Sequence, residues 1–143
     1  MNRSTPVLKD ISYHSVDDQG VFKFIDLVRK GVSSDFFYNA ILTQFSFSLS
    51  DWAVFLHLSE RTLQRYRIEH KTFEPVQSEK ILELTMLFSY GISVFGDKTN
   101  FETWLESTSV ALGTVKPKDL LDTSYGINLL RDELTRIEHG VLA

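Results

Sequence analysis

Apolar residues recur every three or four positions along most of this chain, which is the spacing of amphipathic helices. The first such segment carries Val21, Phe24, Ile25 and Val28 and ends at Gly31. Turn and capping residues separate it from the segments that follow. Ser50-Asp51 and Ser59 are expected to cap two of the later helices, and Gly140 is expected to end the last one. The pattern predicts about seven or eight helices, near residues 21–30, 35–44, 50–56, 59–70, 75–95, 101–105, 117–121 and 125–139.

One short stretch departs from the helical pattern. Residues 45–49 alternate between apolar and polar side chains, which alone would favour a short strand. We expect a connector there, because the sequence offers no partner strand. The predicted fold class is therefore all-α.

Composition and charge narrow the possible functions. Hydrophobic residues make up 43% of the 143 residues and charged residues 24%, a balance typical of a folded chain. The lack of cysteine excludes disulfides, thiolate metal sites and a cysteine nucleophile. A net charge of −4 excludes a uniformly basic nucleic-acid binder but not a local basic face. Since no apolar run reaches the roughly 18 residues of a membrane span, we expect a cytoplasmic protein with no membrane partner.

Residues 49–66 have the pattern of a helix, a tight turn and a second helix. In a helix-turn-helix the second helix enters the major groove of DNA, where Arg pairs with guanine and Gln with adenine. The segment 59–71 is locally basic, and hydroxyl groups at its start can contact phosphate. The expected DNA-binding residues are Ser59, Arg61, Thr62, Gln64, Arg65, Arg67 and Lys71, the last two as contacts to the DNA backbone.

Two features weigh against DNA binding. His57 occupies the turn position where helix-turn-helix proteins usually have glycine, and the acidic balance of the chain weakens attraction to phosphate. Helical hairpins also often carry Arg and Gln as a solvated outer face. The pattern alone therefore leaves open both a DNA-binding helix and a structural interaction protein that does not bind DNA.

The C-terminal half carries short motifs in a fixed order. They are VFGD at 94–97, WL at 104–105, ALG at 111–113, PKDLLD at 117–122, YG at 125–126 and RIEHGV at 136–141. With these motifs, the chain resembles the Xre/MbcA/ParS-type antitoxins, which pair with RES-domain toxins in bacteria. The resemblance runs from about residue 27 to the end. It implies an Xre-like helix-turn-helix DNA-binding domain at 20–73 and a C-terminal helical toxin-binding module at 74–143. Residues 1–19 are polar and unpatterned, and we expect them to form a mobile N-terminal arm.

The resemblance also implies a function. Antitoxins of this family dimerise, bind the operator of their own operon and hold the cognate RES toxin inactive. That toxin resembles ADP-ribosyltransferases and consumes NAD⁺, so the nucleotide chemistry would belong to the partner. The C-terminal module would cover the entrance to the toxin's active site. The toxin-binding residues carried over are Pro117, Gly126, Arg136, Glu138, His139, Gly140 and Val141, whereas Trp104, Leu120 and Leu121 also match but are expected in the core.

Two positions of the module depart from the family pattern. Thr114 stands where a second glycine is common, and Leu129-Leu130 replaces an acidic residue or Val. These departures leave the module intact but leave the choice of partner open.

Catalysis has little support in the sequence. It contains no Gly-rich phosphate loop and no GxSxG turn. Adjacent acids such as Asp132-Glu133 point in different directions on a helix, and the histidines lack the three or four ligands of a zinc site. We expect no enzyme activity, no metal and no cofactor.

Two further expectations concern partners. Phe22, Phe36 and Phe37 exceed what a one-sided apolar stripe needs, which predicts a homodimer built by the first two helices. The alternative to an antitoxin is a stand-alone helix-turn-helix transcriptional regulator without a toxin partner.

Overall fold

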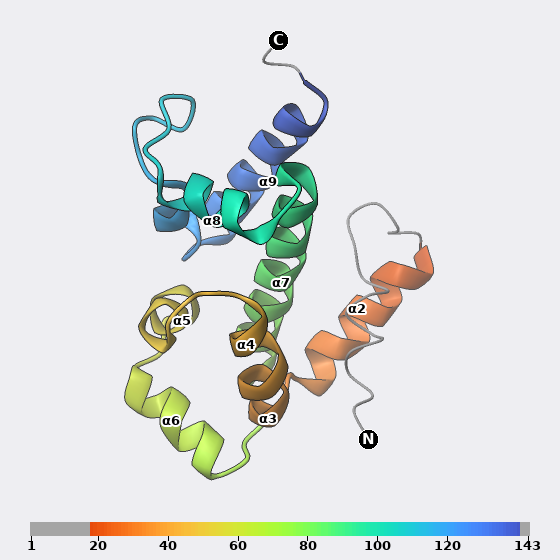
Figure 1. Cartoon of the computed structure of the whole chain (residues 1–143). Coiled ribbons are helices and arrows are strands. Elements are labelled where there is room, and N and C mark those ends of the chain that lie inside the picture. Colours follow the sequence, from red (N-terminus) through yellow and green to blue (C-terminus); the bar gives the residue numbers. More distant parts are fainter. Residues whose placement is uncertain (1–17, 141–143) are drawn as a thin grey trace. The chain divides into compact units, whose positions relative to one another are not determined.

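The structure, a computed structural model, describes residues 18–140 (Figure 1). The chain forms two compact units, the N-terminal unit up to Met86 and the C-terminal unit from Leu87 onwards. This division falls inside a long helix, and the domain boundary expected at 73/74 stays a prediction. Of the expected N-terminal arm, residues 1–17 lie outside the described part, and Asp18 already begins the first described helix.

Helices dominate both units. Within residues 18–140 no β-strand occurs, and isolated bridges join Ser33 to Thr72 and Ser109 to Val115. The prediction of an all-α fold is confirmed. The elements are α2 (Asp18–Lys30), α3 (Ser34–Phe36), a π-helical turn η1 (Phe37–Ile41), α4 (Leu42–Gln44), α5 (Leu49–Leu56), α6 (Glu60–Ile68), α7 (Pro75–Phe95), α8 (Lys98–Glu106), a 3₁₀ turn η2 (Pro117–Leu120) and α9 (Ser124–Glu138).

Helix α5 begins earlier than the sequence suggested, with Ser48 as its cap in place of Ser50-Asp51. The Ser48 hydroxyl accepts a hydrogen bond from the Asp51 N–H at 3.0 Å, and the Asp51 carboxylate accepts one from the Ser48 N–H at 3.0 Å. This reciprocal pair satisfies two backbone donors at the helix start. The connector before it has no strand structure, as expected, and buries Phe45 and Phe47.

An aromatic cluster forms the core of the N-terminal unit. Phe37 is fully buried, and the rings of Tyr38, Trp52 and Phe73 lie edge-on to it at centroid distances of 5.4, 5.2 and 5.4 Å. Edge-to-face pairs add to the hydrophobic stabilisation of such a core. The expectation that Phe37 lies in a dimer surface is therefore wrong. Trp52 of α5 and Phe73, just before α7, cover the ring of Phe37 within the same unit.

The start of α7 is tied to the rest of the N-terminal unit through Ser78. Its buried hydroxyl accepts a hydrogen bond from the Val32 N–H at 2.8 Å and donates one to the Phe73 carbonyl at 3.1 Å. Because both hydrogen-bonding roles are used, burial of this polar group is compensated. The chain after α2 and the first turn of α7 are thereby held side by side.

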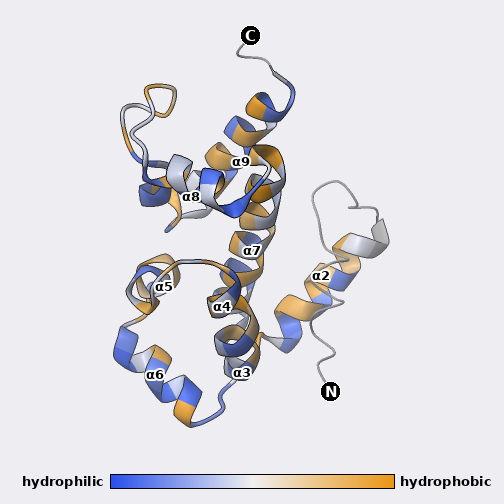
Figure 2. Cartoon of the chain, viewed as in Figure 1, coloured by the Kyte–Doolittle hydropathy of each residue, from blue (hydrophilic) through white to orange (hydrophobic). Residues whose placement is uncertain are grey.

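Helix α2 keeps its apolar residues in contact with solvent. No residue from Gly20 to Lys30 is buried, and Phe22 is 69% exposed. Orange and blue residues alternate along this helix in Figure 2, as expected for an amphipathic segment. Phe36, the remaining member of the expected dimer surface, is half-buried.

The C-terminal unit packs the second half of α7 against α8, with η2 and α9 completing it. The Phe101 ring lies near Phe88 and Phe95, each at a centroid distance of 6.2 Å. Helix α9 buries Ile127, Leu130 and Leu134. Of the family-matched residues expected in the core, Leu121 is fully buried, whereas Trp104 and Leu120 are half-buried.

No helix within residues 18–140 has both the length and the apolar character needed to cross a membrane.

Candidate functional site

The turn between α5 and α6 sets the direction of the second helix of the motif. His57 ends α5 in the left-handed region with φ of 55°, and its N–H bonds back to the carbonyls of Ala53 and Val54. Ser59 caps α6, because its hydroxyl accepts a hydrogen bond from the Thr62 N–H at 3.0 Å. The pattern predicted both the turn at His57 and the cap at Ser59.

The outer face of α6 is open to solvent. Arg61, Gln64 and Arg65 are exposed, and most of α6 is coloured as hydrophilic in Figure 2. Leu63, on the opposite side, is fully buried and fixes the helix to the unit. A short helix with exposed Arg and Gln on one face is suited to reading base edges in a major groove.

Sequence reasoning missed one member of this face. Ile68 lies four residues after Gln64 and is 78% exposed. Residues four apart share a helix face, so Ile68 extends the row of Arg61, Gln64 and Arg65. The spacing is visible in the sequence, but the expected face was drawn from its polar and basic residues alone.

The two basic residues expected to contact the DNA backbone lie over tyrosine rings. The Arg67 guanidinium carbon lies 4.8 Å from the centroid of Tyr38, and Lys71 Nζ lies 5.1 Å from the centroid of Tyr66. Such cation–π contacts are worth about 0.5–1 kcal/mol when exposed. Arg67 and Lys71 are exposed as well, so each charge remains accessible from solvent.

Tyr38 is an unusual neighbour for Arg67. Its ring is buried, and its hydroxyl has no hydrogen-bond partner among the described residues. Burial raises the pKa of Tyr38 above its ordinary value, and the charge of Arg67 partly offsets this effect. The phenol therefore stays neutral, and the guanidinium interacts with the face of its ring.

The expected DNA-binding residues thus gather on and around one helix. Ser59, Arg61, Gln64, Arg65, Arg67 and Lys71 are exposed, and Thr62 is half-buried. The Ser59 hydroxyl already donates to Thr62 Oγ1 at 2.9 Å, so a phosphate contact by Ser59 would replace that bond.

Two of the residues expected to bind a toxin lie inside the C-terminal unit. Pro117 and Gly126 are buried. A Cβ at Gly126 would lie 1.8 Å from the carbonyl oxygen of Leu120, so glycine is needed where α9 passes η2. Their burial favours packing roles for both residues, and a part of either in toxin binding stays a prediction.

Arg136 is held by a buried acid of its own helix. Glu133 is 4% exposed, and its Oε2 accepts hydrogen bonds from the Arg136 Nε–H at 3.1 Å and from the Nη2–H. The guanidinium itself remains about half exposed, at 48% for the side chain. Sequence reasoning did not single out Glu133, although it lies three residues after the buried Leu130 and so falls on the inner side of α9.

Glu138 is oriented by a residue from α7. The buried Tyr90 hydroxyl donates to Glu138 Oε1 at 2.9 Å, with Thr135 Oγ1 a second acceptor at 3.2 Å. Burial raises the pKa of Tyr90, and the hydrogen bond and negative charge of Glu138 raise it further, whereas the hydrogen bond with Thr135 lowers it. The Tyr90 proton is therefore retained at neutral pH, and the phenol acts as a donor that holds the carboxylate.

The residues after Glu138 are accessible as far as the structure describes them. His139 is exposed, with Nε2 3.9 Å from Glu138 Oε1. Gly140 follows with φ of 66° and ends the helix, as the sequence predicted. The last expected toxin-binding residue, Val141, lies outside the described residues.

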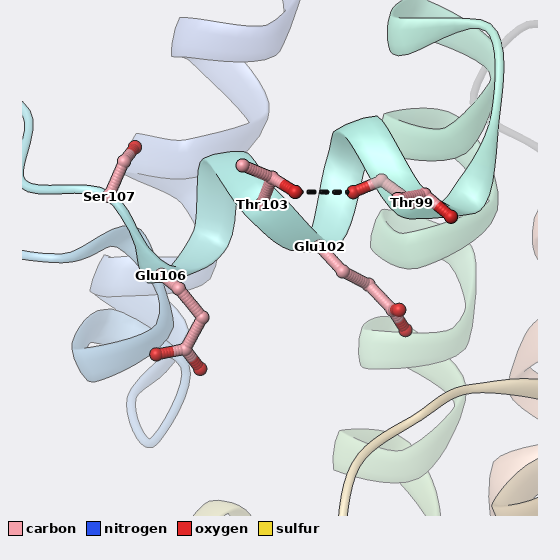
Figure 3. Close-up of a pocket in the computed structure, with 5 residues that line it drawn as sticks. All are labelled: Thr99, Glu102, Thr103, Glu106 and Ser107. Carbon is pink, nitrogen blue, oxygen red and sulfur yellow. Dashed lines mark hydrogen bonds between the residues drawn. The ribbon is translucent and has the colours of Figure 1, made fainter.

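A shallow open hollow of about 550 Å³ runs along α8 (Figure 3). It is lined by Thr99, Glu102, Thr103, Glu106 and Ser107. The Thr103 hydroxyl donates to the Thr99 carbonyl at 2.8 Å, and Glu106 Oε1 pairs with Lys118 Nζ at 2.9 Å. The hydrogen bond from Lys118 holds the pKa of Glu106 below its ordinary value. Within residues 18–140, no three His, Asp or Glu side chains gather as metal ligands.

Two family models match the chain, one on each side of the middle of α7. The antitoxin Xre-like helix-turn-helix domain matches residues 23–85, and the antitoxin Xre/MbcA/ParS C-terminal toxin-binding domain matches residues 91–140. The chain belongs to the Xre-type antitoxins. The family resemblance drawn from the sequence motifs is thereby confirmed.

Two curated relatives carry the same family name. The chain is 32% identical over 87 residues to the "Antitoxin Xre" of Yersinia enterocolitica serotype O:8 / biotype 1B, which covers 60% of this chain and 59% of that protein. It is 29% identical over 72 residues to the "Antitoxin Xre" of Photorhabdus laumondii subsp. laumondii, which covers 50% of this chain and 49% of that protein. The chain thus spans about half the length of these relatives.

In this Xre-type antitoxin the candidate residues fall on different domains. Helix α6 lies within the helix-turn-helix match, and α8 and α9 lie within the toxin-binding match. The exposed basic face of α6 therefore belongs to the helix-turn-helix domain. Arg136 and Glu138 of α9, which Glu133 and Tyr90 hold in place, belong to the toxin-binding domain.

Proposed function

We propose that this chain neutralises a toxin through its C-terminal unit and binds operator DNA through α6. The observation that carries the proposal is the joining of an Xre-like helix-turn-helix domain to a toxin-binding domain in one chain. The exposure of Arg61 and Arg65 supports the DNA role, because buried arginines could not reach a groove. The exposure of Arg136, Glu138 and His139 supports a protein contact at the end of α9.

The proposed toxin is a RES-domain protein that degrades NAD⁺. This assignment rests on the RIEHGV motif at 136–141 together with the motifs before it. The antitoxin supplies no chemistry in this scheme. Its C-terminal unit covers the entrance to the toxin's active site and so prevents NAD⁺ from entering.

The proposed DNA target is the operator of the chain's own operon. Arg61, Gln64 and Arg65 supply base contacts, each worth about 1–3 kcal/mol of discrimination when bidentate. Arg67 and Lys71 contact phosphates at the edge of the groove. Because the chain is acidic overall, this local basic helix must provide most of the attraction to DNA.

Operator binding of this kind is strengthened by a homodimer, and α2 is the proposed site of self-association. Its described side chains are not buried, and Phe22 projects into solvent. A second copy would cover these apolar groups and place two α6 helices on one DNA site. Sedimentation of the full chain at micromolar concentration tests this, and a single 16.5 kDa species would remove the dimer.

Co-expression tests the antitoxin role directly. The chain is produced with the toxin-like protein encoded next to its gene, and the pair is purified through a tag on the toxin. We expect a stable complex and restored cellular NAD⁺ relative to toxin alone. Failure to co-purify together with unrelieved NAD⁺ loss would remove the antitoxin proposal. A gel shift on the region upstream of the gene then decides whether the chain is instead a stand-alone transcriptional regulator.

A further inference from the structure

Helix α9 carries exposed apolar residues on its outer side. Tyr125 is 90% exposed and Leu129 is 42% exposed. They lie four residues apart, so their side chains share one face of the helix. Asp132 and Arg136 follow after three and four further residues and are also exposed, which continues this face toward the C-terminal end.

This outer face is separate from the side by which α9 is packed. Ile127, Leu130 and Leu134 fill the core from the inner side of the helix. The core of the unit is therefore filled without Tyr125, and Leu129 is only partly covered by the unit. Tyrosine is enriched among the residues that dominate binding energy at protein interfaces, because it buries a large area at small entropic cost.

Arg136, at the other end of the face, is arranged in advance for an anionic partner group. Two hydrogen bonds to the buried Glu133 fix its guanidinium through Nε and Nη2. Fixing a long side chain before association lowers the entropy lost on binding. The exposed part of the guanidinium can still donate to a carboxylate or another anion.

We propose that the face formed by Tyr125, Leu129 and Arg136 is the surface on which the toxin docks. The inference rests on the proposed antitoxin function, and it adds a defined contact surface to the helix end that carries Glu138 and His139. The whole face lies within the residues matched by the toxin-binding domain. The guanidinium of Arg136, which Glu133 holds in place, makes one end of the face positive, so this end complements an acidic group on the partner. The partner offers an apolar hollow that receives Tyr125 and Leu129, with an acidic group beside it for Arg136.

The leucine at position 129 fits this assignment. Leu129 lies one helical turn after Tyr125 and is 42% exposed. An apolar residue next to the exposed tyrosine enlarges the apolar part of the face, and it keeps Asp132 as the single exposed acid between this part and Arg136.

The test measures affinity between the full chain and a candidate RES-domain toxin, sought first among the genes next to its own, by titration calorimetry. The double variant Tyr125→Ala/Leu129→Ala is expected to bind roughly 10- to 100-fold more weakly, the range expected for residues that dominate an interface. Matched controls are Val76→Ala, an exposed apolar residue of the N-terminal unit, and Asn128→Ala, an exposed neighbour on α9. Both controls should bind as the unchanged chain does, and thermal melting should be similar for all variants.

The positioning role of Glu133 is tested in combination with Arg136. Glu133→Gln should weaken binding about 3- to 10-fold and reduce its salt dependence, as Arg136→Met does. In the Arg136→Met background, Glu133→Gln should cause no further loss, because its effect passes through the guanidinium. A purely structural role would instead give additive losses and unchanged salt dependence.

The outcomes separate this inference from the function on which it rests. If the unchanged chain does not bind the toxin, the antitoxin proposal fails and this surface fails with it. If the unchanged chain binds and the double variant binds within a factor of three, the antitoxin proposal stands and the surface is wrong. If the double variant loses self-association in sedimentation but keeps toxin affinity, the face joins two copies of this chain, which also overturns the proposal.

Discussion

The candidate DNA face of α6 and the candidate toxin face of α9 are built from different side chains. On α6, three exposed polar or basic residues stand beside a single exposed isoleucine, Ile68. On α9, Tyr125 and Leu129 provide an apolar half, and buried groups of the same unit hold Arg136 and Glu138 in place. The α6 face suits phosphate and base edges that are surrounded by water, whereas the α9 face suits a desolvated protein contact.

This difference predicts that the two activities respond differently to salt. DNA binding through solvated arginines depends on the release of counterions, so it should weaken steeply as salt rises. A contact centred on Tyr125 and Leu129 relies on burial of apolar area, which is not screened by salt. The predictions below change one unit or one face at a time and run from the largest expected effect to the smallest.

Gly126→Ala should have the largest effect, because it places a methyl group against backbone. The added Cβ would lie 1.8 Å from the Leu120 carbonyl oxygen, and a backbone atom cannot move aside cheaply. We expect the C-terminal unit to lose about 3 kcal/mol of stability. Urea unfolding followed by circular dichroism measures the loss, and Ser124→Ala, on the exposed side of the same helix, is the control.

The same variant tests whether the units are independent. In a Trp104→Phe background, Trp52 in the N-terminal unit is the remaining tryptophan of the chain. Its fluorescence should then report a much smaller loss of stability for Gly126→Ala than circular dichroism does. Equal losses by fluorescence and by circular dichroism would mean that the two units unfold together through α7.

The double substitution Arg61→Ala/Arg65→Ala should abolish most of the DNA affinity without affecting the toxin contact. Two lost base contacts correspond to roughly a 100-fold weaker operator complex, and the preference for operator over unrelated DNA should fall with it. Gel shifts on operator and on unrelated DNA measure both quantities. Lys116→Ala, which removes an exposed positive charge from the C-terminal unit, should have little effect. Unchanged operator binding in the double variant would show that α6 does not read the DNA.

The sequence pattern predicted the helices well because their signals are local. The expected helix 75–95 is α7 residue for residue, and Ser59 caps α6 as its position suggested. Ser48 was missed because Ser50 also fits a cap, and the choice depends on a reciprocal bond with Asp51. Local periodicity could therefore place the helices but not decide between neighbouring caps.

The candidate sites were harder to predict because burial depends on residues far apart in the chain. Phe37 was expected on a dimer surface, because its burial depends on contacts with Trp52 and Phe73, which are distant in the sequence. Pro117 and Gly126 matched a family motif, and a motif does not separate packing from contact. Glu133 was considered only as an acid adjacent to Asp132 and was set aside because neighbouring residues point in different directions on a helix. The tethering of Arg136 and Glu138 could not be foreseen, since the Tyr90 that holds Glu138 comes from another helix.

Thr114→Gly should stabilise the C-terminal unit by about 1 kcal/mol. Thr114 has φ of 64°, a conformation that is strained for a β-branched residue and is free of strain for glycine. The loop is closed by the Ser109–Val115 bridge, which the substitution leaves in place. Thermal melting measures the gain, and Thr114→Ala, which keeps the Cβ, should recover a smaller part of it. A lower melting temperature for the glycine variant would show that the threonine side chain contributes contacts that outweigh the strain.

His57→Gly offers the matched change in the N-terminal unit, with the smallest expected effect. His57 has φ of 55°, but histidine tolerates this region better than threonine, so the gain should be a few tenths of a kcal/mol, about half that of Thr114→Gly. Glycine also gives the unfolded chain more freedom, which offsets part of the relief. Melting curves in the Trp104→Phe background measure it. Because His57 ends α5 and does not lie on the face of Arg61 and Arg65, operator affinity should not change. A loss of affinity would place the His57 ring at the DNA backbone and make the unusual turn residue part of the DNA face.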